Sequence, residues 1–272
     1  MAEADGAPVL DLEIDQGVAR LWLNRPARRN AFDAAMVAQL TALLGQLGGR
    51  DSVRVIVVGG RGAAFCAGAD LDWMVEQGGR SQAGNLEDAQ RLAQMFAALD
   101  ACPKPTIARV HGACFGGGVG LVATCDIALA ATSARFSLSE ARAGLLPATI
   151  GPYVLRAIGH REASRYMLTG GVFDGAEAAR IGLVHEPVAD TSLDAAVDRS
   201  VAALLACGPR AQRETKRLLR DLAGRPIDAA VRADTAARIA DARASAEGRE
   251  GLQAMLEKRT PRWPPDAGGE GA

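Results

Sequence analysis

The sequence contains few lysines, few aromatic residues and no excess of either charge. Among 31 basic residues only Lys104, Lys216 and Lys258 are lysines, and aromatic residues make up 4% of the 272-residue chain. The 31 basic residues face 32 acidic ones, which gives a formal net charge of −1. A balanced charge lacks the positive surface that attracts nucleic acids and anionic membranes, so we expect neither as a partner.

Long apolar runs and paired cysteines are missing as well. No window approaches the roughly 20 apolar residues of a membrane-spanning helix, and residues 1–8 do not have the basic-then-apolar order of a signal peptide. The five cysteines form no Cys-x-x-Cys motif, and the three histidines form no cluster with them. We therefore expect a soluble, cytoplasmic protein without a metal site, whose cysteines are buried, reduced thiols.

Apolar residues recur with the spacing of alternating strands and helices from residue 9 to about residue 190. Continuous apolar runs are typical of strands buried on both faces, whereas a spacing of three to four residues indicates helices. We expect strands at 10–14, 18–23, 53–58, 106–110 and 127–131 and helices at 36–47 and 86–99. This alternation predicts an α/β fold.

The last third of the chain changes character. From Asp194 to Lys258 no strand pattern occurs, and helical runs are separated by Gly-Pro and Gly-Arg-Pro breaks. We divide the chain into a core over 1–195, a helical region over 196–260 and a tail over 261–272. The helical region either packs on the core or serves assembly, and the Pro- and Gly-rich tail is expected to be irregular or disordered.

A glycine-dense segment, Gly112-Ala-Cys-Phe-Gly-Gly-Gly-Val-Gly120, follows the strand expected at 106–110. Successive glycines expose backbone N–H groups, and a helix over 121–124 would add the positive end of its dipole. Such a place suits an anion or a developing oxyanion. The spacing matches neither nucleotide-binding glycine motif. The same glycines would equally serve a tight turn with close packing of helix and strand.

Two further segments suit chemistry. Phe65-Cys-Ala-Gly-Ala-Asp-Leu71 follows a buried strand, and its small residues leave backbone amides accessible where open α/β sheets place ligands. Glu140 stands among apolar and small residues, where desolvation of its carboxylate suits general acid–base catalysis. The alternative for Glu140 is a surface carboxylate that pairs with Arg142 or caps a helix. We interpret His111 and Asp126 as structural residues.

Taken in order, these segments resemble the crotonase, or enoyl-CoA hydratase/isomerase, superfamily from about residue 18 to Lys258. The matching segments are Leu23-Asn-Arg-Pro26 with Asn30-Ala31, Ala64 to Leu71, Lys104-Pro-Thr-Ile-Ala, Val110-His-Gly112, Gly116 to Gly118 and Cys125-Asp-Ile127. Segments 69–73, 111–125 and 139–159 are most similar to bacterial methylglutaconyl-CoA hydratases and related hydratases. The resemblance implies a spiral of ββα turns with C-terminal helices that trimerise it, and trimers that often pair into hexamers.

The resemblance also implies an active site for an acyl-CoA substrate, with no further cofactor. The backbone N–H groups of Ala69 and Gly117 would form an oxyanion hole, and Glu140 would be the catalytic acid and base. The residues expected to contact substrate or CoA are Ala67, Ala69, Asp70, Leu71, Asp72, Gly117 and Lys258, with Arg25, Arg28 and Arg29 near the CoA entrance. Lys258 would reach the CoA of a neighbouring subunit; the alternative for it is a solvated helix end.

One position departs from the family pattern. Hydratases of the family usually hold one water between two glutamates, and the second of these falls on Gly120. We expect a hydratase of short or branched, perhaps carboxylated, enoyl-CoA that acts through Glu140, in fatty acid or branched-chain amino acid degradation. A double-bond isomerase that uses the same single glutamate and a non-catalytic acyl-CoA-binding protein stay open. RNA binding, known for some relatives, is disfavoured by the balanced charge.

Overall fold

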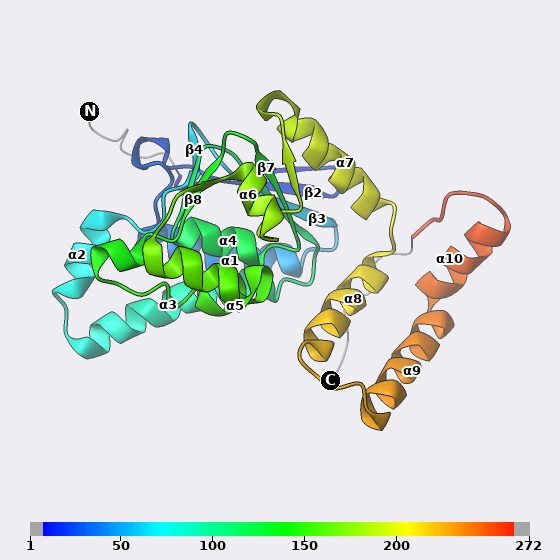
Figure 1. The fold of residues 1–272 in the computed structure, drawn as a ribbon. Coiled ribbons are helices and arrows are strands. Elements are labelled where there is room, and N and C mark those ends of the chain that lie inside the picture. Colours follow the sequence, from blue (N-terminus) through cyan, green and yellow to red (C-terminus); the bar gives the residue numbers. More distant parts are fainter. Residues whose placement is uncertain (1–7, 264–272) are drawn as a thin grey trace.

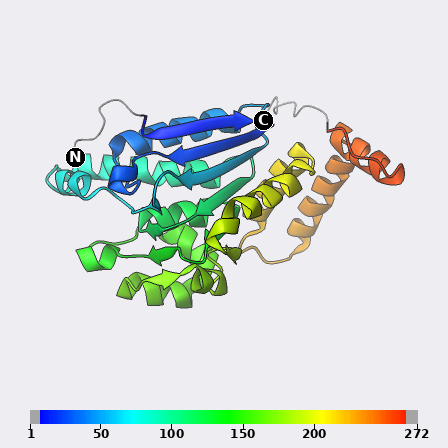
Figure 2. The ribbon, with the colours of Figure 1, turned by 90° about the horizontal axis from the view of Figure 1, so that it is seen from above.

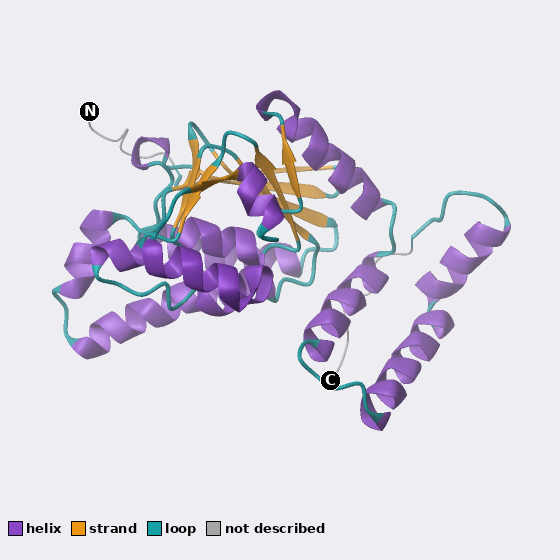
Figure 3. Ribbon diagram, viewed as in Figure 1, coloured by secondary structure: helices purple, strands orange, loops and turns teal. Residues whose placement is uncertain are grey.

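The computed structural model describes residues 8–263, which form two β-sheets covered by helices (Figures 1 and 3). The strands are β1 (Leu10–Asp15), β2 (Val18–Leu23), β3 (Val55–Gly60), β4 (Ala64–Cys66), β5 (Thr106–Val110), β6 (Ala113–Phe115), β7 (Ile127–Ala131), β8 (Arg135–Ser137), β9 (Phe173–Asp174) and β10 (Glu186–Val188). The α-helices are α1 (Ala34–Gly48), α2 (Leu71–Gly78), α3 (Gln82–Asp100), α4 (Gly117–Thr124), α5 (Gly151–Thr169), α6 (Gly175–Arg180), α7 (Leu193–Leu205), α8 (Pro209–Leu222), α9 (Ala229–Ala244) and α10 (Ala246–Leu256). Short 3₁₀ helices are η1 (Pro26–Arg28), η2 (Glu140–Ala143) and η3 (Asp190–Ser192).

From β3 to β8, consecutive strands alternate between the two sheets. The six-stranded sheet has the order β1-β2-β3-β5-β7-β10 and is parallel except for β1, which pairs antiparallel with β2. The four-stranded sheet has the order β4-β6-β8-β9, with β4, β6 and β8 parallel. From β3 to α5 each turn of chain gives one strand to the larger sheet, the next to the smaller sheet, and then one or two helices. The predicted α/β class and the repeated ββα turn are confirmed.

Local sequence explains where the elements begin. All six residues of β3 are buried, as expected for a strand covered on both faces. The strand starts two residues later than predicted, because the N–H of Val53 is bonded to the carbonyl of Arg50 in the preceding turn. Helix α1 begins after Asp33, whose carboxylate accepts a hydrogen bond from the N–H of Met36 at 2.8 Å and so caps the helix.

Helices α1, α3, α4 and α5 lie together beneath the strands in Figure 1. Their buried side chains join those of β2, β3, β5 and β7 in one continuous apolar core. Helix α7 continues this cover on the other side of the larger sheet, where its Leu193 and Val197 are buried. The core thus holds the turns that follow β4, β6 and β8 in fixed positions.

The C-terminal helices α8, α9 and α10 extend outward from the core (Figures 1 and 2). Helix α8 is tied back by Lys216, whose Nζ lies 2.9 Å from the carbonyl of Lys104 and 2.5 Å from Oδ2 of Asp126. Large apolar side chains stay exposed on this arm at Leu219, Ile239, Leu252, Met255 and Leu256. The helical character predicted here is found, and the role of the arm in trimerisation stays a prediction. Residues 264–272 of the predicted tail, and 1–7, lie outside the described residues.

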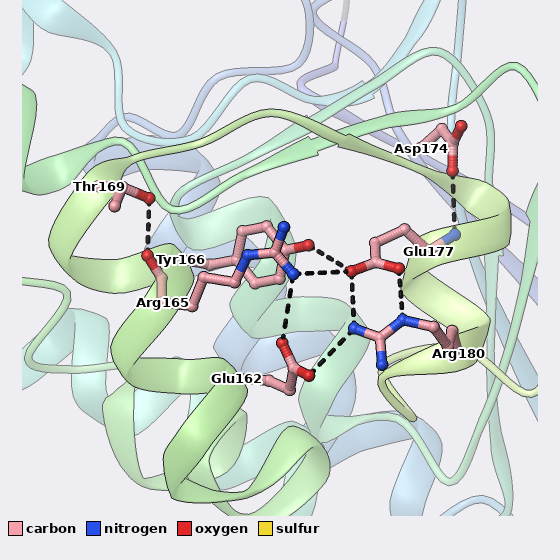
Figure 4. Close-up of polar contacts among 7 residues, drawn as sticks. All are labelled: Glu162, Arg165, Tyr166, Thr169, Asp174, Glu177 and Arg180. Carbon is pink, nitrogen blue, oxygen red and sulfur yellow. Dashed lines mark hydrogen bonds and ion pairs between the residues drawn. The ribbon is translucent and has the colours of Figure 1, made fainter.

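A polar cluster joins α5 to α6 beside the smaller sheet (Figure 4). Glu177 accepts hydrogen bonds from Arg180 at 2.6 Å and from the hydroxyl of Tyr166 at 2.5 Å, and these two donors lower the pKa of Glu177 to about 2. At the end of α5, the carbonyl of Gly170 accepts a hydrogen bond from Oγ of Ser137 in β8 at 3.0 Å. The cluster fixes α5 against α6, and the bond from Ser137 fixes the end of α5 against β8, the strand that leads to η2.

The cysteines differ from one another in exposure. Cys66, Cys102 and Cys114 are buried, Cys125 is half-buried and Cys207 is exposed, and all five are free thiols. The prediction of buried thiols is therefore wrong for Cys207, which follows α7 at the start of the outward arm. Within residues 8–263, no helix has the length and apolar character needed to cross a membrane, and no three metal-ligating side chains gather to hold an ion.

Candidate active site

The turn after β4 presents a backbone N–H that the fold leaves without a partner. Phe32 bridges this turn: its N–H donates to the carbonyl of Gly68 at 2.7 Å, and its carbonyl accepts from the N–H of Asp70 at 2.7 Å. In a parallel bridge of this kind the N–H of the middle residue, Ala69, points to the opposite side. No acceptor for it is found among residues 8–263, so Ala69 offers a free donor.

A second free donor lies at the start of α4. The helix begins at Gly117, four residues earlier than the glycine-rich sequence suggests, and the N–H groups of a first helical turn have no acceptor within the helix. The N–H of Gly116 is bonded to the carbonyl of Ser137 at 2.8 Å, whereas no acceptor for Gly117 is found in the described part of the chain. The positive end of the helix dipole lies at the same point.

Two glycines let these turns approach each other. Strands β4 and β6 are parallel neighbours, so the turns that follow them lie side by side. Gly68 and Gly116 both have positive φ, +95° and +48°. A Cβ on Gly68 would stand 3.0 Å from the carbonyl oxygen of Phe115, and a Cβ on Gly116 would stand 3.8 Å from the Cα of Gly68. The donors of Ala69 and Gly117 therefore border one small space.

The carboxylate of Glu140 lies against this space. Glu140 opens η2, directly after β8, and its Oε1 stands 3.1 Å from the point where a Cβ on Gly116 would be. Its Oε2 is buried and has no hydrogen-bond partner in residues 8–263. Burial raises the pKa of the Glu140 carboxyl above its ordinary value, and the bond to its own backbone N–H acts in the opposite direction. These features are typical of a general acid or base in a site from which water is largely excluded.

Arg142 does not pair with Glu140. Its Nε donates to the carbonyl of Thr169 at 3.3 Å, so the side chain reaches the end of α5 instead. The alternative of a surface carboxylate paired with Arg142 is therefore wrong. The guanidinium of Arg142 packs against Gly170, so it does not face the space beside Glu140. In this position Arg142 is not a partner for a charged acyl group.

The position of the missing second glutamate is filled by apolar side chains. A Cβ on Gly120 would stand 2.2 Å from Cγ2 of Ile150 and 2.9 Å from Cε1 of Phe96. Phe96 meets Phe32 edge-on, with ring centroids 6.4 Å apart, and Phe32 in turn lies 2.6 Å from where a Cβ on Gly117 would be. A glutamate side chain at position 120 would overlap Ile150 and Phe96, because these two residues pack directly against the glycine.

A buried ion pair supports the Ala69 turn. Arg25 lies 3.1 Å from Oδ2 of Asp70 and 3.3 Å from Oδ2 of Asp33, and it donates to the carbonyl of Ala31 at 2.7 Å. The Asp70 carboxylate also accepts from the N–H of Asp72 at 3.1 Å and so caps α2. Arg25 thus links the segment before α1 to the turn that carries the donor. The sequence analysis placed Arg25 near the CoA entrance and did not predict its ion pairs with Asp33 and Asp70. Only the fold brings these three positions together.

The other predicted contacts fall in different places. The N–H of Ala67 donates to the carbonyl of Arg29 at 2.9 Å, and Leu71 is exposed at the start of α2. Asp72 is exposed and pairs with Arg28 at 2.9 Å. Lys258 follows α10 on the outward arm, so this chain alone does not bring it to Ala69 and Gly117 (Figure 1). Their contacts with CoA stay predictions.

His111 and Asp126 have structural roles, as interpreted from the sequence. The ring of His111 is held between the carbonyl of Gly62 at 2.8 Å and the guanidinium of Arg109 at 3.1 Å. Asp126 accepts hydrogen bonds from the backbone and hydroxyl of Thr106 at 2.8 and 2.9 Å. Neither side chain is left available for a reacting group.

Comparison with known proteins identifies this arrangement. The sequence profile of the enoyl-CoA hydratase/isomerase family matches residues 13–266. The chain belongs to the enoyl-CoA hydratase/isomerase family. The crystal structure of an enoyl-CoA hydratase from Shewanella pealeana superposes with a TM-score of 0.91 at 42% identity, over 94% of this chain and 96% of that one. The resemblance to the crotonase superfamily and the expectation of an enzyme are thereby confirmed.

Curated relatives agree at the level of the family. The mitochondrial enoyl-CoA hydratase domain-containing protein 2 of Bos taurus is 35% identical over 259 residues, which is 92% of this chain and 85% of the relative. Enoyl-CoA hydratase ACTT6 of Alternaria alternata is 37% identical over 185 residues. That match takes in 68% of this chain and spans 60% of the length of ACTT6.

Proposed function

We propose that the protein is an enoyl-CoA hydratase that adds water across the C2–C3 double bond of a short or branched enoyl-CoA. The observation that carries the proposal is the meeting of two unpartnered N–H donors, Ala69 and Gly117, with the half-buried Glu140 carboxylate. A thioester oxygen between the two donors gains negative charge as the enolate forms. Losing one preorganised donor of this type typically costs about 3 kcal/mol of transition-state stabilisation.

A single carboxylate is sufficient for the proton balance of hydration. Glu140 accepts a proton from water while the water oxygen bonds to C3, and the electrons of the double bond move to the thioester oxygen. The protonated Glu140 then returns its proton to C2, which regenerates the carboxylate and completes the addition. The raised pKa of Glu140 favours the first step, because a carboxylate with a higher pKa is a stronger base toward water.

The finer features of the proposal concern substrate, assembly and location. We include carboxylated, methylglutaconyl-like acyl groups among the substrates, in fatty acid or branched-chain amino acid degradation in the cytoplasm. The exposed apolar residues of α9 and α10 support assembly into a trimer or hexamer, in which Lys258 would reach a neighbouring subunit's CoA. The reaction needs no cofactor besides the CoA of the substrate.

The test follows the conjugated enoyl-thioester absorbance with crotonyl-CoA and 3-methylglutaconyl-CoA, and determines the product mass. A fall in absorbance with the gain of one water is the expected result. Glu140→Gln should lower kcat by about 10² to 10⁴ while KM changes little, because general acid–base catalysis contributes that factor. The control is Glu186→Gln, a change at an exposed residue of β10. Unchanged turnover in Glu140→Gln would refute the mechanism.

A double-bond isomerase is the second candidate, and the filled space at Gly120 favours it specifically. A lone carboxylate beside an oxyanion hole can carry a proton between two substrate carbons without fixing a water. An isomerase would convert a 3-enoyl-CoA to the conjugated isomer with no change in mass. A protein that binds acyl-CoA tightly and turns over neither substrate would instead be a non-catalytic acyl-CoA-binding protein.

A further inference from the structure

Asn30 is fully buried, and both N–H groups of its side-chain amide have acceptors. Its exposed fraction is 0%. Nδ2 donates to the carbonyl of Arg61 at 2.9 Å and to that of Ala64 at 2.8 Å. Oδ1 accepts from the backbone N–H of Arg25 at 2.9 Å. A side-chain amide has two N–H donors, so these partners fix the direction in which the amide faces. All three bonds are made to backbone groups, so Asn30 holds the chain around it in place.

The backbone at Asn30 is held in a left-handed conformation. Its φ is +58°, and the φ of Arg29 is +52°. Two successive residues other than glycine rarely adopt positive φ, and asparagine does so at a lower cost than most residues. Strain of this kind persists only where the surrounding contacts impose it. The side-chain bonds of Asn30 supply such contacts.

The segment that Asn30 anchors runs beside the turn that carries Ala69. The carbonyl of Arg29 accepts a hydrogen bond from the N–H of Ala67 at 2.9 Å. Phe32, two residues after Asn30, bonds to both chain neighbours of Ala69 at 2.7 Å. The direction of the Ala69 N–H is therefore set by a segment whose own position depends on Asn30.

The side chain of Asn30 also fixes where β4 starts. Ala64 is the first residue of β4, and Arg61 lies in the turn before it. Strand β4 has three residues, and its pairing with β6 shifts in register between Ala64 and Cys66. The pairing sets the distance between the two strands, whereas a short ladder with a shift leaves the offset along them to other contacts. The bond from Asn30 to Ala64 is such a contact.

We propose that Asn30 is the positioning residue for the Ala69 donor. Through Ala64 it sets the offset of β4, and through Phe32 it holds the turn that follows β4. The N–H of Ala69 is thereby directed to the same space as that of Gly117, where the thioester oxygen binds in the proposed function. The proposal rests on that function, because only a bound thioester gives the direction of this N–H a chemical effect.

The test follows the carbonyl stretch of butyryl-CoA that carries carbon-13 at the thioester carbon. Two N–H donors polarise the bound carbonyl, so its infrared band should lie at lower frequency on the native protein than in solution. Asn30→Gly keeps the freedom to adopt positive φ and removes the three side-chain bonds. In this variant we expect the infrared shift to shrink by about half, because one of the two donors is displaced.

The catalytic rate should report the same displacement. Asn30→Gly should lower kcat for crotonyl-CoA by about 10- to 100-fold, less than the 10²- to 10³-fold typical of complete removal of an oxyanion donor. The affinity for butyryl-CoA in titration calorimetry should change by no more than about threefold, because such donors act mainly on the charged transition state. A purely structural role would lower the midpoint of thermal unfolding and leave the infrared shift and the kcat of the folded enzyme unchanged.

A second variant and a matched control complete the series. Asn30→Ser retains one hydroxyl donor and should lie between the native protein and Asn30→Gly in both the infrared shift and kcat. Asn85→Gly, at an exposed residue in the first turn of α3, is the control and should leave both values unchanged. A native infrared shift and a native kcat in a folded Asn30 variant would overturn the proposal. If neither variant folds, Asn30 is required for folding itself and the positioning role is rejected.

The infrared measurement does not depend on turnover, so its outcome is distinct from that of the hydration assay. A shift that shrinks in Asn30→Gly, without hydration of any enoyl-CoA by the native protein, would retain the positioning role and reject the hydratase. Hydration of crotonyl-CoA with the same shift in both proteins would retain the hydratase and reject the positioning role. Absence of a shift in the native protein would reject the oxyanion hole and this proposal with it.

Discussion

Replacing Gly120 by alanine tests whether Ile150 and Phe96 pack so closely against position 120 that only glycine fits there. The added Cβ would stand 2.2 Å from Cγ2 of Ile150, a β-branched side chain that is 2% exposed and has little freedom to turn aside. Overpacking of this kind costs up to about 3 kcal/mol. The change from glycine to alanine inside a helix returns about 1 kcal/mol. Gly120→Ala should therefore lower the free energy of unfolding by about 2 kcal/mol.

A double-mutant cycle with Ile150→Ala isolates the contact. Ile150→Ala alone should cost about 3 kcal/mol, within the range for truncating a buried isoleucine. In the double variant the alanine at 120 no longer meets a methyl group and fills part of the cavity. The loss should then be about 2 rather than 5 kcal/mol, because the gain from alanine in the helix remains, which is an interaction energy of about 3 kcal/mol.

Urea unfolding at one fixed protein concentration measures the four proteins of the cycle. Gly45→Ala in α1 is the control, because nothing lies within 4 Å of a Cβ at that position, and it should stabilise the protein by about 1 kcal/mol. If the two single changes add to within about 0.5 kcal/mol, the Cβ does not meet Ile150 and the reasoning fails.

Four further outcomes follow from burial and charge. Burial raises the pKa of Glu140, so kcat/KM should rise with pH and level off only above that raised pKa; a plateau already at the ordinary glutamate pKa would contradict the assignment. The native state holds this proton more tightly than the unfolded chain does. Stability relative to Glu140→Gln should therefore fall as pH rises from the ordinary pKa through the raised one, in thermal melts over a pH series. Arg25→Met leaves the buried Asp70 unpaired and should lower the free energy of unfolding by about 3 kcal/mol, with a loss of kcat; equal stability would refute the supporting role of the ion pair. Toward a thiol reagent the exposed Cys207 should react first, whereas Cys66, whose pKa burial raises to about 12, should react only on unfolding; early modification of Cys66 would contradict the core packing.

The sequence predicted the elements whose signal is local. Periodic apolar residues located α1 and five strands of the larger sheet, because binary patterning and burial on both faces are properties of short segments. The sixth strand, β10, has only three residues and was missed. Helix α2 was missed, and α4 was placed four residues late, since glycines carry no periodic pattern. The start of α4 matters most, because it makes Gly117 a first-turn residue with a free N–H.

The candidate site was predictable only in part. Ala69, Gly117 and Glu140 were named through the family resemblance, and the fold brings them together. The Arg25 ion pairs and the contact of Ile150 with position 120 were out of reach, since each joins residues far apart in the chain. The bonds from Asn30 to Arg61 and Ala64 were hidden for the same reason.

The pairing of β4 with β6 fixes the distance between the N–H groups of Ala69 and Gly117. The N–H groups of Ala69 and Gly117, proposed as oxyanion donors, follow these two strands within three residues, so their separation derives from the distance of about 4.8 Å between neighbouring strands. That distance is a property of backbone hydrogen bonding, which side-chain replacement leaves unchanged. Residues around the acyl chain can therefore be replaced without a change in the spacing of the two N–H donors. One polypeptide frame can in this way accept new acyl groups while the chemistry at the carbonyl stays constant.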